Sequence, residues 1–275
     1  MKRILIASAL ALATAAPAFA ADLPPPAAPP PRAPVAYIPA APVFSWTGFY
    51  IGLNGGYGWG HDPVTFSPAN AAAVPYFAAG AVPGSITTNP QGGLFGGQIG
   101  YNYQWSSFVA GVETDFDWAD IRGTGAVSTT AVGFAPFTTS AQQKLTSLGT
   151  FRGRLGFAAD RALFYGTGGL AYGRTQLNTS VLTPTIGCGP AGVCAASSST
   201  QWQTGWTAGA GVEYAFAAGW SGKIEYLHYD LGTPGYNLTP MVSNAPLVRP
   251  FTVNNLTAAT PFSGEILRVG VNYHL

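Results

Sequence analysis

The charged residues that recur at every second position are the first candidates for chemistry in this chain. Glu113, Asp115 and Asp117 alternate with uncharged residues, as do Arg152 and Arg154. Closely spaced carboxylates can act as a general acid and base, whereas carboxylates beside cations can form buried ion pairs. A period of two places such side chains on one face of a β-strand. Their role therefore depends on the elements that carry them.

Further charges follow the same alternating pattern later in the chain. The complete set, called the charge cluster below, comprises Glu113, Asp115, Asp117, Arg152, Arg154, Glu213, Lys223, Glu225 and Arg268. Two interpretations are open: the charges pair and fill an interior, or they line a narrow ion pathway. Because the carboxylates have cationic partners elsewhere in the set, pairing is favoured over acid–base catalysis, and no catalytic residue is predicted.

Eight segments show the alternation of apolar and polar residues that predicts β-strands. They span residues 47–59, 94–104, 108–118, 146–157, 162–173, 204–216, 222–229 and 266–275. Most of them reach the roughly 9–11 residues that a tilted strand needs to cross the hydrocarbon of a membrane. The sequence thus predicts strands that are long enough to span a bilayer.

The two faces of these segments differ in composition. Every Asp, Glu, Lys and Arg within them falls on one face, which also carries glycines and amides. The other face is apolar and ends in aromatic residues, among them Trp59, Trp105, Trp118, Tyr172, Trp206 and Trp220. A charge facing lipid costs about 2–4 kcal/mol at mid-bilayer. This distribution therefore predicts a transmembrane barrel that is polar inside and apolar outside.

The composition agrees with a protein that exposes little surface to water. Only 8% of the 275 residues are charged, against roughly 25% in an ordinary soluble domain. The formal net charge is +1, and no basic patch suits nucleic acid. Beyond the N-terminus, no apolar run is as long as the segment of about 18 residues that a membrane-spanning helix needs. A membrane protein of this sequence is therefore expected to cross with strands.

The connections between the segments alternate in length. Residues 105–107, 158–161 and 217–221 form short turns, whereas residues 60–93, 119–145, 174–203 and 230–265 are predicted to be long loops. Short periplasmic turns and long extracellular loops are typical of outer-membrane barrels. We therefore predict an all-β fold: an eight-stranded antiparallel transmembrane barrel with four long extracellular loops, located in the cell outer membrane.

The N-terminus has the pattern of a secretory signal peptide. Lys2 and Arg3 precede an apolar run, and an A-x-A motif predicts cleavage between Ala20 and Ala21. Residues 21–45 are rich in proline and are predicted to form an extended periplasmic segment. The predicted organisation is a signal peptide at 1–20, this segment at 21–45 and a barrel at 46–275.

Few other residues suggest a site. Cys188 and Cys194 are the only cysteines, and in an exported chain they are expected to form a disulfide within one long loop. No cofactor and no metal site are predicted. Arg174, Asp230 and Glu265 fall at the outer ends of strands, where they are expected to meet the charged head groups of outer-membrane lipids, including lipopolysaccharide.

Several short motifs together resemble a known family. They are Trp46-Thr47-Gly48-Phe49-Tyr50-Ile51-Gly52, Gly97-Gln98-Ile99-Gly100-Tyr101-Asn102-Tyr103-Gln104, Gly111-Val112-Glu113-Thr114-Asp115, Arg152-Gly153-Arg154-Leu155-Gly156, Tyr165-Gly166-Thr167-Gly168-Gly169-Leu170-Ala171-Tyr172-Gly173 and Leu267-Arg268-Val269-Gly270-Val271-Asn272-Tyr273. This set is similar to the small alphaproteobacterial outer-membrane proteins of the RopB type. The resemblance implies an integral, porin-like barrel without a settled substrate.

The resemblance also implies a C-terminal signal that the barrel assembly machinery reads. Arg268, Gly270 and Tyr273 stand where the family has this signal, but Leu275 replaces the usual terminal aromatic residue. Because leucine is apolar and lies on the outward face, we expect assembly to survive.

The main expectation for function is a structural or surface role for a non-enzymatic barrel whose lumen is filled by side chains. One alternative is a narrow porin that passes small solutes or ions. Another is a surface adhesin, or a lipid-modifying enzyme that depends on His228 near the outer rim. A monomer is favoured over an oligomer.

Overall fold

The computed structural model describes residues 44–71, 73–132, 136–182, 193–240 and 256–275. The side chains of residues 193–195, 239 and 240 are not described. The predicted cleavage site between Ala20 and Ala21, nearly all of the Pro-rich segment 21–45, and Cys188 lie outside the described residues. The signal peptide and the disulfide between Cys188 and Cys194 therefore stay predictions.

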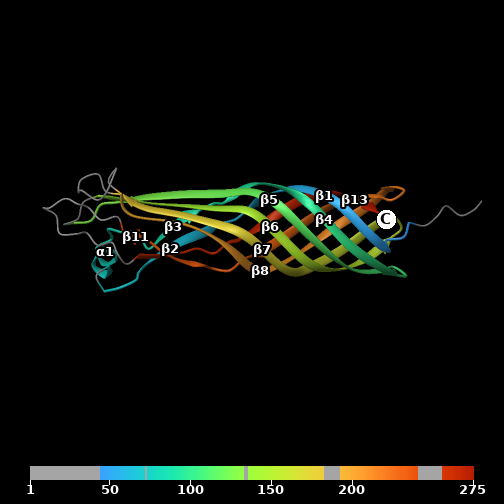
Figure 1. Cartoon of the computed structure of the whole chain (residues 1–275), viewed down its shortest axis with the longest axis horizontal. Helices are drawn as coiled ribbons and strands as arrows, with labels where there is room; N and C mark the ends of the chain where they lie inside the picture. The colour runs from blue at the N-terminus through green and yellow to red at the C-terminus, as the bar shows by residue number, and fades with distance from the viewer. Residues whose placement is uncertain (1–43, 72, 133–135, 183–192, 241–255) are drawn as a thin grey trace, which may run out of the picture. The chain divides into compact units, whose positions relative to one another are not determined.

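Eight long strands form an antiparallel sheet that closes on itself (Figure 1). They are β1 (Gly48–Trp59), β4 (Gln91–Trp105), β5 (Phe108–Thr129), β6 (Phe137–Ala159), β7 (Ala162–Leu182), β8 (Val193–Ala217), β9 (Trp220–Asp230) and β13 (Ser263–His274). The order is β8-β7-β6-β5-β4-β1-β13-β9, and β9 pairs back with β8. A closed ring leaves no unpaired strand edge in lipid. The predicted all-β, eight-stranded antiparallel barrel is confirmed.

The predicted short turns are also confirmed. Ser106 in the β4–β5 turn, Asp160 in the β6–β7 turn and Gly219 in the β8–β9 turn have positive φ angles of 55°, 52° and 74°, as tight hairpin turns require. At this end of the barrel, the amide of His274 donates to the carbonyl of Gly219, and the amide of Leu275 donates to that of Phe49. The first and last strands therefore meet beside the turns.

The prediction that residues 119–145 and 174–203 are loops is wrong. β5, β6, β7 and β8 run on through these segments and reach 22, 23, 21 and 25 residues. Register shifts lie between Trp118 and Ile121 and between Leu145 and Ser147. Beyond these β-bulges the side-chain pattern inverts, with apolar residues inside and Ser, Thr and Gln outside. The sequence prediction required apolar residues outside and so missed these strands.

The segments 60–93 and 230–265, predicted as loops, also contain strands. β2 (Asp62–Pro68), β3 (Ser85–Thr88), β10 (Gly235–Asn237) and β12 (Leu256–Ala259) form a second sheet with the order β10-β12-β2-β3. The short strand β11 (Thr239–Pro240) pairs with β8, and the helix α1 (Val74–Ala78) follows β2. Among the described residues, no helix is long and apolar enough to cross a membrane.

The second sheet shares an apolar core with the far parts of β5, β6 and β7. Together with the far part of β8 they form what we call the extension (Figure 1). Its buried residues are Val64, Phe66, Ala73, Ala81, Val82, Ile86, Phe137, Ala141, Leu177, Val181, Tyr236, Leu238, Leu256 and Ala258. The barrel continues at one end into this folded extension.

Candidate functional site

All nine residues of the charge cluster point into the barrel. None is more than 3% exposed, and they come from β5, β6, β8, β9 and β13. The strand register itself creates opposite-charge pairs, since Glu113 lies opposite Arg152 and Arg268 lies opposite Glu225. The structure therefore brings together the whole set that the alternation predicted.

Arg152 lies at the centre of the charge cluster. Its Nη2 is 2.5 Å from Glu113 Oε1 and 2.8 Å from Asp115 Oδ2, and its Nη1 is 3.0 Å from Glu225 Oε1. Its Nε donates to Thr150 Oγ1 at 2.8 Å. One guanidinium therefore joins carboxylates from β5 and β9, strands that are not neighbours in the ring.

Arg268 makes a parallel set of contacts from β13. Its guanidinium lies 2.9 Å from Asp115 Oδ2, 3.2 Å from Asp117 Oδ2 and 2.6 Å from Glu225 Oε2. Arg152 and Arg268 thus share Asp115 and Glu225. This sharing links the two arginines into one network across the lumen.

Lys223 and Arg154 complete the network toward the turn end. Lys223 Nζ donates to both oxygens of Glu113, at 2.9 and 3.0 Å. Arg154 Nη2 lies 2.7 Å from Glu213 Oε2, and its guanidinium carbon is 3.9 Å from the centroid of the Tyr165 ring. Tyr50 donates its hydroxyl hydrogen to Glu113 Oε2 at 2.8 Å and accepts from Arg154 at 2.9 Å.

Glu213 is also held by neutral donors. Ser221 Oγ and Asn272 Nδ2 donate to its Oε1 at 2.5 and 2.6 Å. His274 Nε2 lies 3.5 Å from the same oxygen, so this histidine faces the interior. Buried charges cost several kcal/mol each unless they are paired and hydrogen-bonded. Each carboxylate of the charge cluster meets at least one cation at 3.2 Å or less.

Apolar layers adjoin the charge cluster at both ends of the lumen. The layer at the turn end comprises Trp46, Val109, Ala158, Leu163, Tyr165 and Ala215. The layer toward the extension comprises Leu94, Ile121, Leu145, Leu148, Ala171, Leu227, Tyr229, Leu231, Phe262 and Ile266. Charged side chains therefore fill the middle of the lumen, and apolar side chains fill the space on either side.

Trp46 is the residue of this arrangement that sequence reasoning missed. It precedes β1, is fully buried, and its backbone amide donates to Gln104 Oε1 at 2.9 Å. Its ring lies 5.6 Å from the His274 ring and 4.8 Å from that of Phe44. Because Trp46 lies before the alternating segment, no periodic signal distinguishes it from the outward tryptophans.

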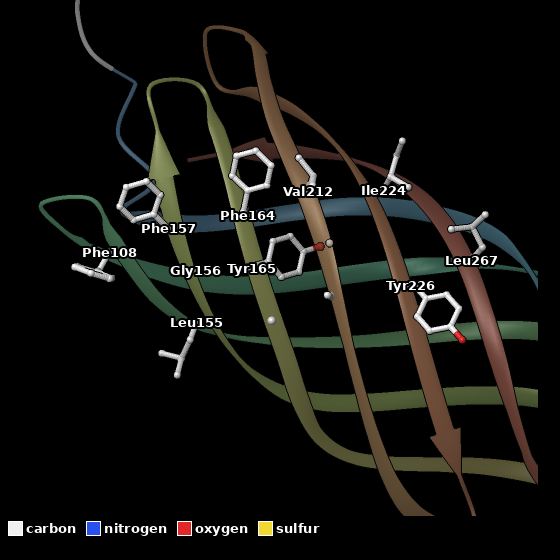
Figure 2. Close-up of a pocket in the computed structure, with 13 residues that line it drawn as sticks. Phe108, Leu155, Gly156, Phe157, Phe164, Tyr165, Val212, Ile224, Tyr226 and Leu267 are labelled. Atoms are coloured by element: carbon white, nitrogen blue, oxygen red, sulfur yellow. The ribbon is translucent and has the colours of Figure 1, made fainter.

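The outward face of the barrel is apolar, as predicted. Phe108, Leu155 and Phe164 are 63%, 72% and 52% exposed, and they border a shallow hollow on the outer surface (Figure 2). Trp105 and Trp118, predicted as membrane-interface aromatics, are 76% and 58% exposed. No element of the described residues covers these side chains, which suit contact with lipid.

The histidine considered for lipid chemistry and the predicted assembly signal lie at opposite ends of the β9–β13 pair. Near the extension, His228 Nδ1 is 2.9 Å from Glu265 Oε1, and the His228 ring is 5.1 Å from that of Trp206. At the other end, Tyr273 and Leu275 face outward and are 41% and 75% exposed. Arg268 and Gly270 of the same predicted signal face inward, where Arg268 belongs to the charge cluster.

Comparisons with known proteins agree with this architecture. The chain is 36% identical over 238 residues to the 31 kDa outer-membrane immunogenic protein of Brucella melitensis, covering 85% of this chain and 86% of that protein. It is 30% identical to the 25 kDa outer-membrane immunogenic protein of Brucella abortus, over 99% of this chain and 98% of that one. A 22 kDa outer membrane protein of Rhizobium leguminosarum is 29% identical, over 73% of this chain and 71% of that one.

Solved outer-membrane proteins are more distant. OprG of Pseudomonas aeruginosa is 13% identical, with a TM-score of 0.45 over 83% of this chain and 97% of that one. The model of the outer membrane protein beta-barrel domain matches residues 6–274. With an eight-stranded closed sheet, a charged interior and an apolar outer face, the chain belongs to the family of outer-membrane β-barrel proteins.

Proposed function

We propose that this outer-membrane protein is a closed barrel with a structural and surface role, and that it neither conducts solutes nor catalyses a reaction. The observation that carries this proposal is that three successive layers of side chains fill the lumen. They are the apolar layer at the turn end, which contains Trp46, the charge cluster, and the apolar layer toward the extension, which contains Leu148. An eight-stranded barrel has an interior just wide enough for its own side chains.

The pairing within the charge cluster supports the same proposal. An ion pathway needs charged groups that exchange partners with a passing ion. Here the guanidinium groups of Arg152 and Arg268 each lie within 3.2 Å of three carboxylates. An ion entering the lumen would have to break several of these buried contacts, which are costly to disrupt.

A liposome-swelling assay tests the porin alternative. Refolded mature protein is reconstituted with small sugars and amino acids outside the vesicles, beside a conducting porin and empty vesicles. We expect swelling rates that match the empty vesicles. Swelling that rises with the amount of folded, inserted protein would contradict the closed barrel.

The relatives suggest where the surface role lies. Two of them are named immunogenic outer-membrane proteins, and in this chain the extension is the folded part beyond the membrane strands. We propose that antibodies raised against the intact cell surface recognise the extension. Surface labelling of cells that carry the chain with residues 62–88 replaced by a short turn should then fall, while the barrel still assembles.

A lipid-modifying activity is the remaining alternative, and His228 is its only candidate residue. The His228–Glu265 contact would supply a base, but the described contacts of the His228 ring are with Glu265 and Trp206, and Thr207 reaches only the backbone carbonyl of His228. We expect lipid extracts of cells that express the wild-type protein and a His228→Ala variant to be identical. A lipid species lost in the variant would contradict this expectation.

A further inference from the structure

Three cationic side chains lie together on the outer surface where the barrel passes into the extension. Arg122 on β5 and Lys144 on β6 lie just beyond the β-bulges, and Arg174 on β7 lies beside the bulge of β6, opposite Ser147. The side chain of Arg122 is 57% exposed, that of Lys144 is 35% exposed, and Arg174 is exposed as well. We call these three residues the cation triplet.

The strand register holds the cation triplet together. Arg122 lies opposite Lys144, and Lys144 lies opposite Gln176. Arg174 is therefore the diagonal neighbour of Lys144, a position at which side chains are about 7–8 Å apart. Within the described part of the chain, Asp120 is the single carboxylate paired with the triplet, contacting Arg122 and, at 3.4 Å, Lys144. The group keeps an excess of two positive charges.

An apolar surface adjoins the cation triplet on the barrel side. Trp118, Tyr172 and Trp202 lie at this level, and the rings of Tyr172 and Trp202 are 6.4 Å apart. Further into the barrel, Phe151 on β6 and Leu170 on β7 are 55% and 67% exposed. Aromatic residues at this position mark the boundary between hydrocarbon and head groups. The triplet therefore lies at the level of lipid head groups.

An uncharged polar surface adjoins the triplet on the extension side. Asn178 Nδ2 donates to Gln142 Oε1 at 3.1 Å, Ser198 Oγ donates to Asn178 Oδ1 at 2.8 Å, and Ser140 and Ser180 are 2.7 Å apart. A groove of about 420 Å³ is lined by Ser140, Gln142, Asn178 and Ser180 of β6 and β7 and by Thr124 of β5. Hydroxyl and amide groups that can both donate and accept suit the hydroxyl groups of sugars.

The opposite side of the barrel carries the reverse charge. At the corresponding ends of β9 and β13, the outward residues include Asp230 and Glu265. The cation triplet is therefore a feature of the β5–β7 side and not part of a uniform ring. This asymmetry points to a ligand that binds one side of the protein.

We propose that the β5–β7 face binds a phosphorylated glycolipid of the outer leaflet. The cation triplet contacts the phosphate groups, the polar groove contacts the sugars, and the acyl chains lie against the apolar surface of β6 and β7. Arg and Lys form strong, charge-assisted hydrogen bonds with phosphate oxygens. The order of apolar, cationic and polar surfaces along the strands matches the order of acyl chains, phosphates and sugars in such a lipid. This inference does not depend on whether the lumen conducts.

Binding of rough lipopolysaccharide to the refolded mature protein in neutral detergent tests this proposal. The test variant combines Arg122→Gln, Lys144→Gln and Arg174→Gln, and the matched control is Arg161→Gln, an exposed arginine in the β6–β7 turn at the other end of the barrel. Each interfacial cation contributes about fivefold to the binding of anionic lipid. We expect the triple variant to bind at least about tenfold more weakly and the control to bind within about twofold of wild type.

Two further probes identify the chemistry. Lipopolysaccharide treated with phosphatase should bind the wild type as weakly as the intact lipid binds the triple variant. Millimolar inorganic phosphate should not displace the intact lipid, because it lacks the sugars and the acyl chains. A variant with Arg122→Lys and Arg174→Lys should retain binding.

Three results would overturn the proposal. They are equal binding by the triple variant and the Arg161→Gln control, undiminished binding of the dephosphorylated lipid, and full displacement by inorganic phosphate. The heat-modifiable mobility of each variant on gels establishes that its barrel is folded. A triple variant that is folded and still binds normally would therefore count against the cation triplet itself.

Discussion

The lumen of the barrel and the core of the extension are built from the same strands but have opposite chemistry. In the barrel part of β6, Arg152 and Arg154 point inward and Phe151 points outward. In the extension part, Phe137 and Ala141 are buried inside, whereas polar residues face outward. The comparison teaches that the medium outside the sheet, lipid or water, decides which residues a continuous strand places inside.

The change between the two patterns coincides with irregularities in the strands. The pairing of β5 with β6 shifts register between Trp118 and Ile121, and the pairing of β6 with β7 shifts register between Leu145 and Ser147. A β-bulge bends a strand and re-aims its side chains. The bulges therefore mark the boundary between the part that faces lipid and the part that faces water.

The largest effect is expected from breaking the charge cluster at Arg268. An Arg268→Met variant removes the cation that pairs with the buried Asp117, and it leaves Asp115 and Glu225 with Arg152 alone of the two arginines that they share. Removing one partner of a buried ion pair costs about 3–5 kcal/mol. Urea unfolding of the refolded barrel in detergent, followed by tryptophan fluorescence, measures the loss. An Arg161→Met variant at the exposed turn is the control, and equal stability of the two would refute the prediction.

A smaller and more local effect is expected in the extension core. Leu177 is 1% exposed in that core, and a Leu→Ala change at a buried site costs about 2–5 kcal/mol. A Leu177→Ala variant should expose the extension to protease while the barrel keeps its heat-modifiable mobility. Simultaneous loss of both parts would show that the lumen and the extension do not have separable stabilities.

An arginine placed at two positions on the outward face of β6, one in the barrel and one in the extension, should distinguish the two regions directly. Phe151→Arg places a charge against lipid, at a cost of about 2–4 kcal/mol. Gln142→Arg places the same charge on the exposed face of the extension, where substitutions usually change stability by less than about 0.5 kcal/mol. Urea midpoints of the two variants in lipid vesicles provide the measurement. Equal decreases in the urea midpoint would indicate that both positions face the same medium, which would contradict the comparison.

The smallest effect is expected from pH. Burial raises the pKa of Asp62 in the extension, although the Ser263 hydroxyl and amide both donate to its carboxylate. Because the folded state holds this proton more tightly than the unfolded state, the extension is stabilised at low pH and loses that contribution as pH rises through the raised pKa. The protease resistance of the wild type relative to Asp62→Asn should therefore decrease from pH 4 to pH 7. A relative protease resistance that stays constant between pH 4 and pH 7 would contradict the raised pKa of Asp62.

The sequence predicted the barrel and the charge cluster well because both depend on alternation. Glu113 and Asp115 are identified as neighbours on one face by their spacing alone, and the register then adds Arg152 opposite Glu113. The specific contacts of Arg268 with carboxylates on β5 and β9 could not be predicted, since they depend on closure of the ring.

The extension was missed for a physical reason. Its strands place small polar residues outside and apolar residues inside, which is the reverse of the pattern expected for strands that face lipid. These segments were therefore predicted to be loops. Trp46 was missed because it folds into the lumen from a segment without alternation. A search that allows the pattern to invert at a bulge would have recovered β5 and β6 in full.

Single-channel recording in a planar bilayer tests the central claim, that paired charges between two apolar layers close the lumen. Refolded mature protein is inserted at known density, with a conducting porin in the same bilayers as a control. The account predicts that the folded wild-type protein carries no steady current at any voltage at which the bilayer is stable. Reproducible openings with a conductance that changes in an Arg152→Ala/Arg154→Ala variant would contradict it and identify a pathway through the charge cluster.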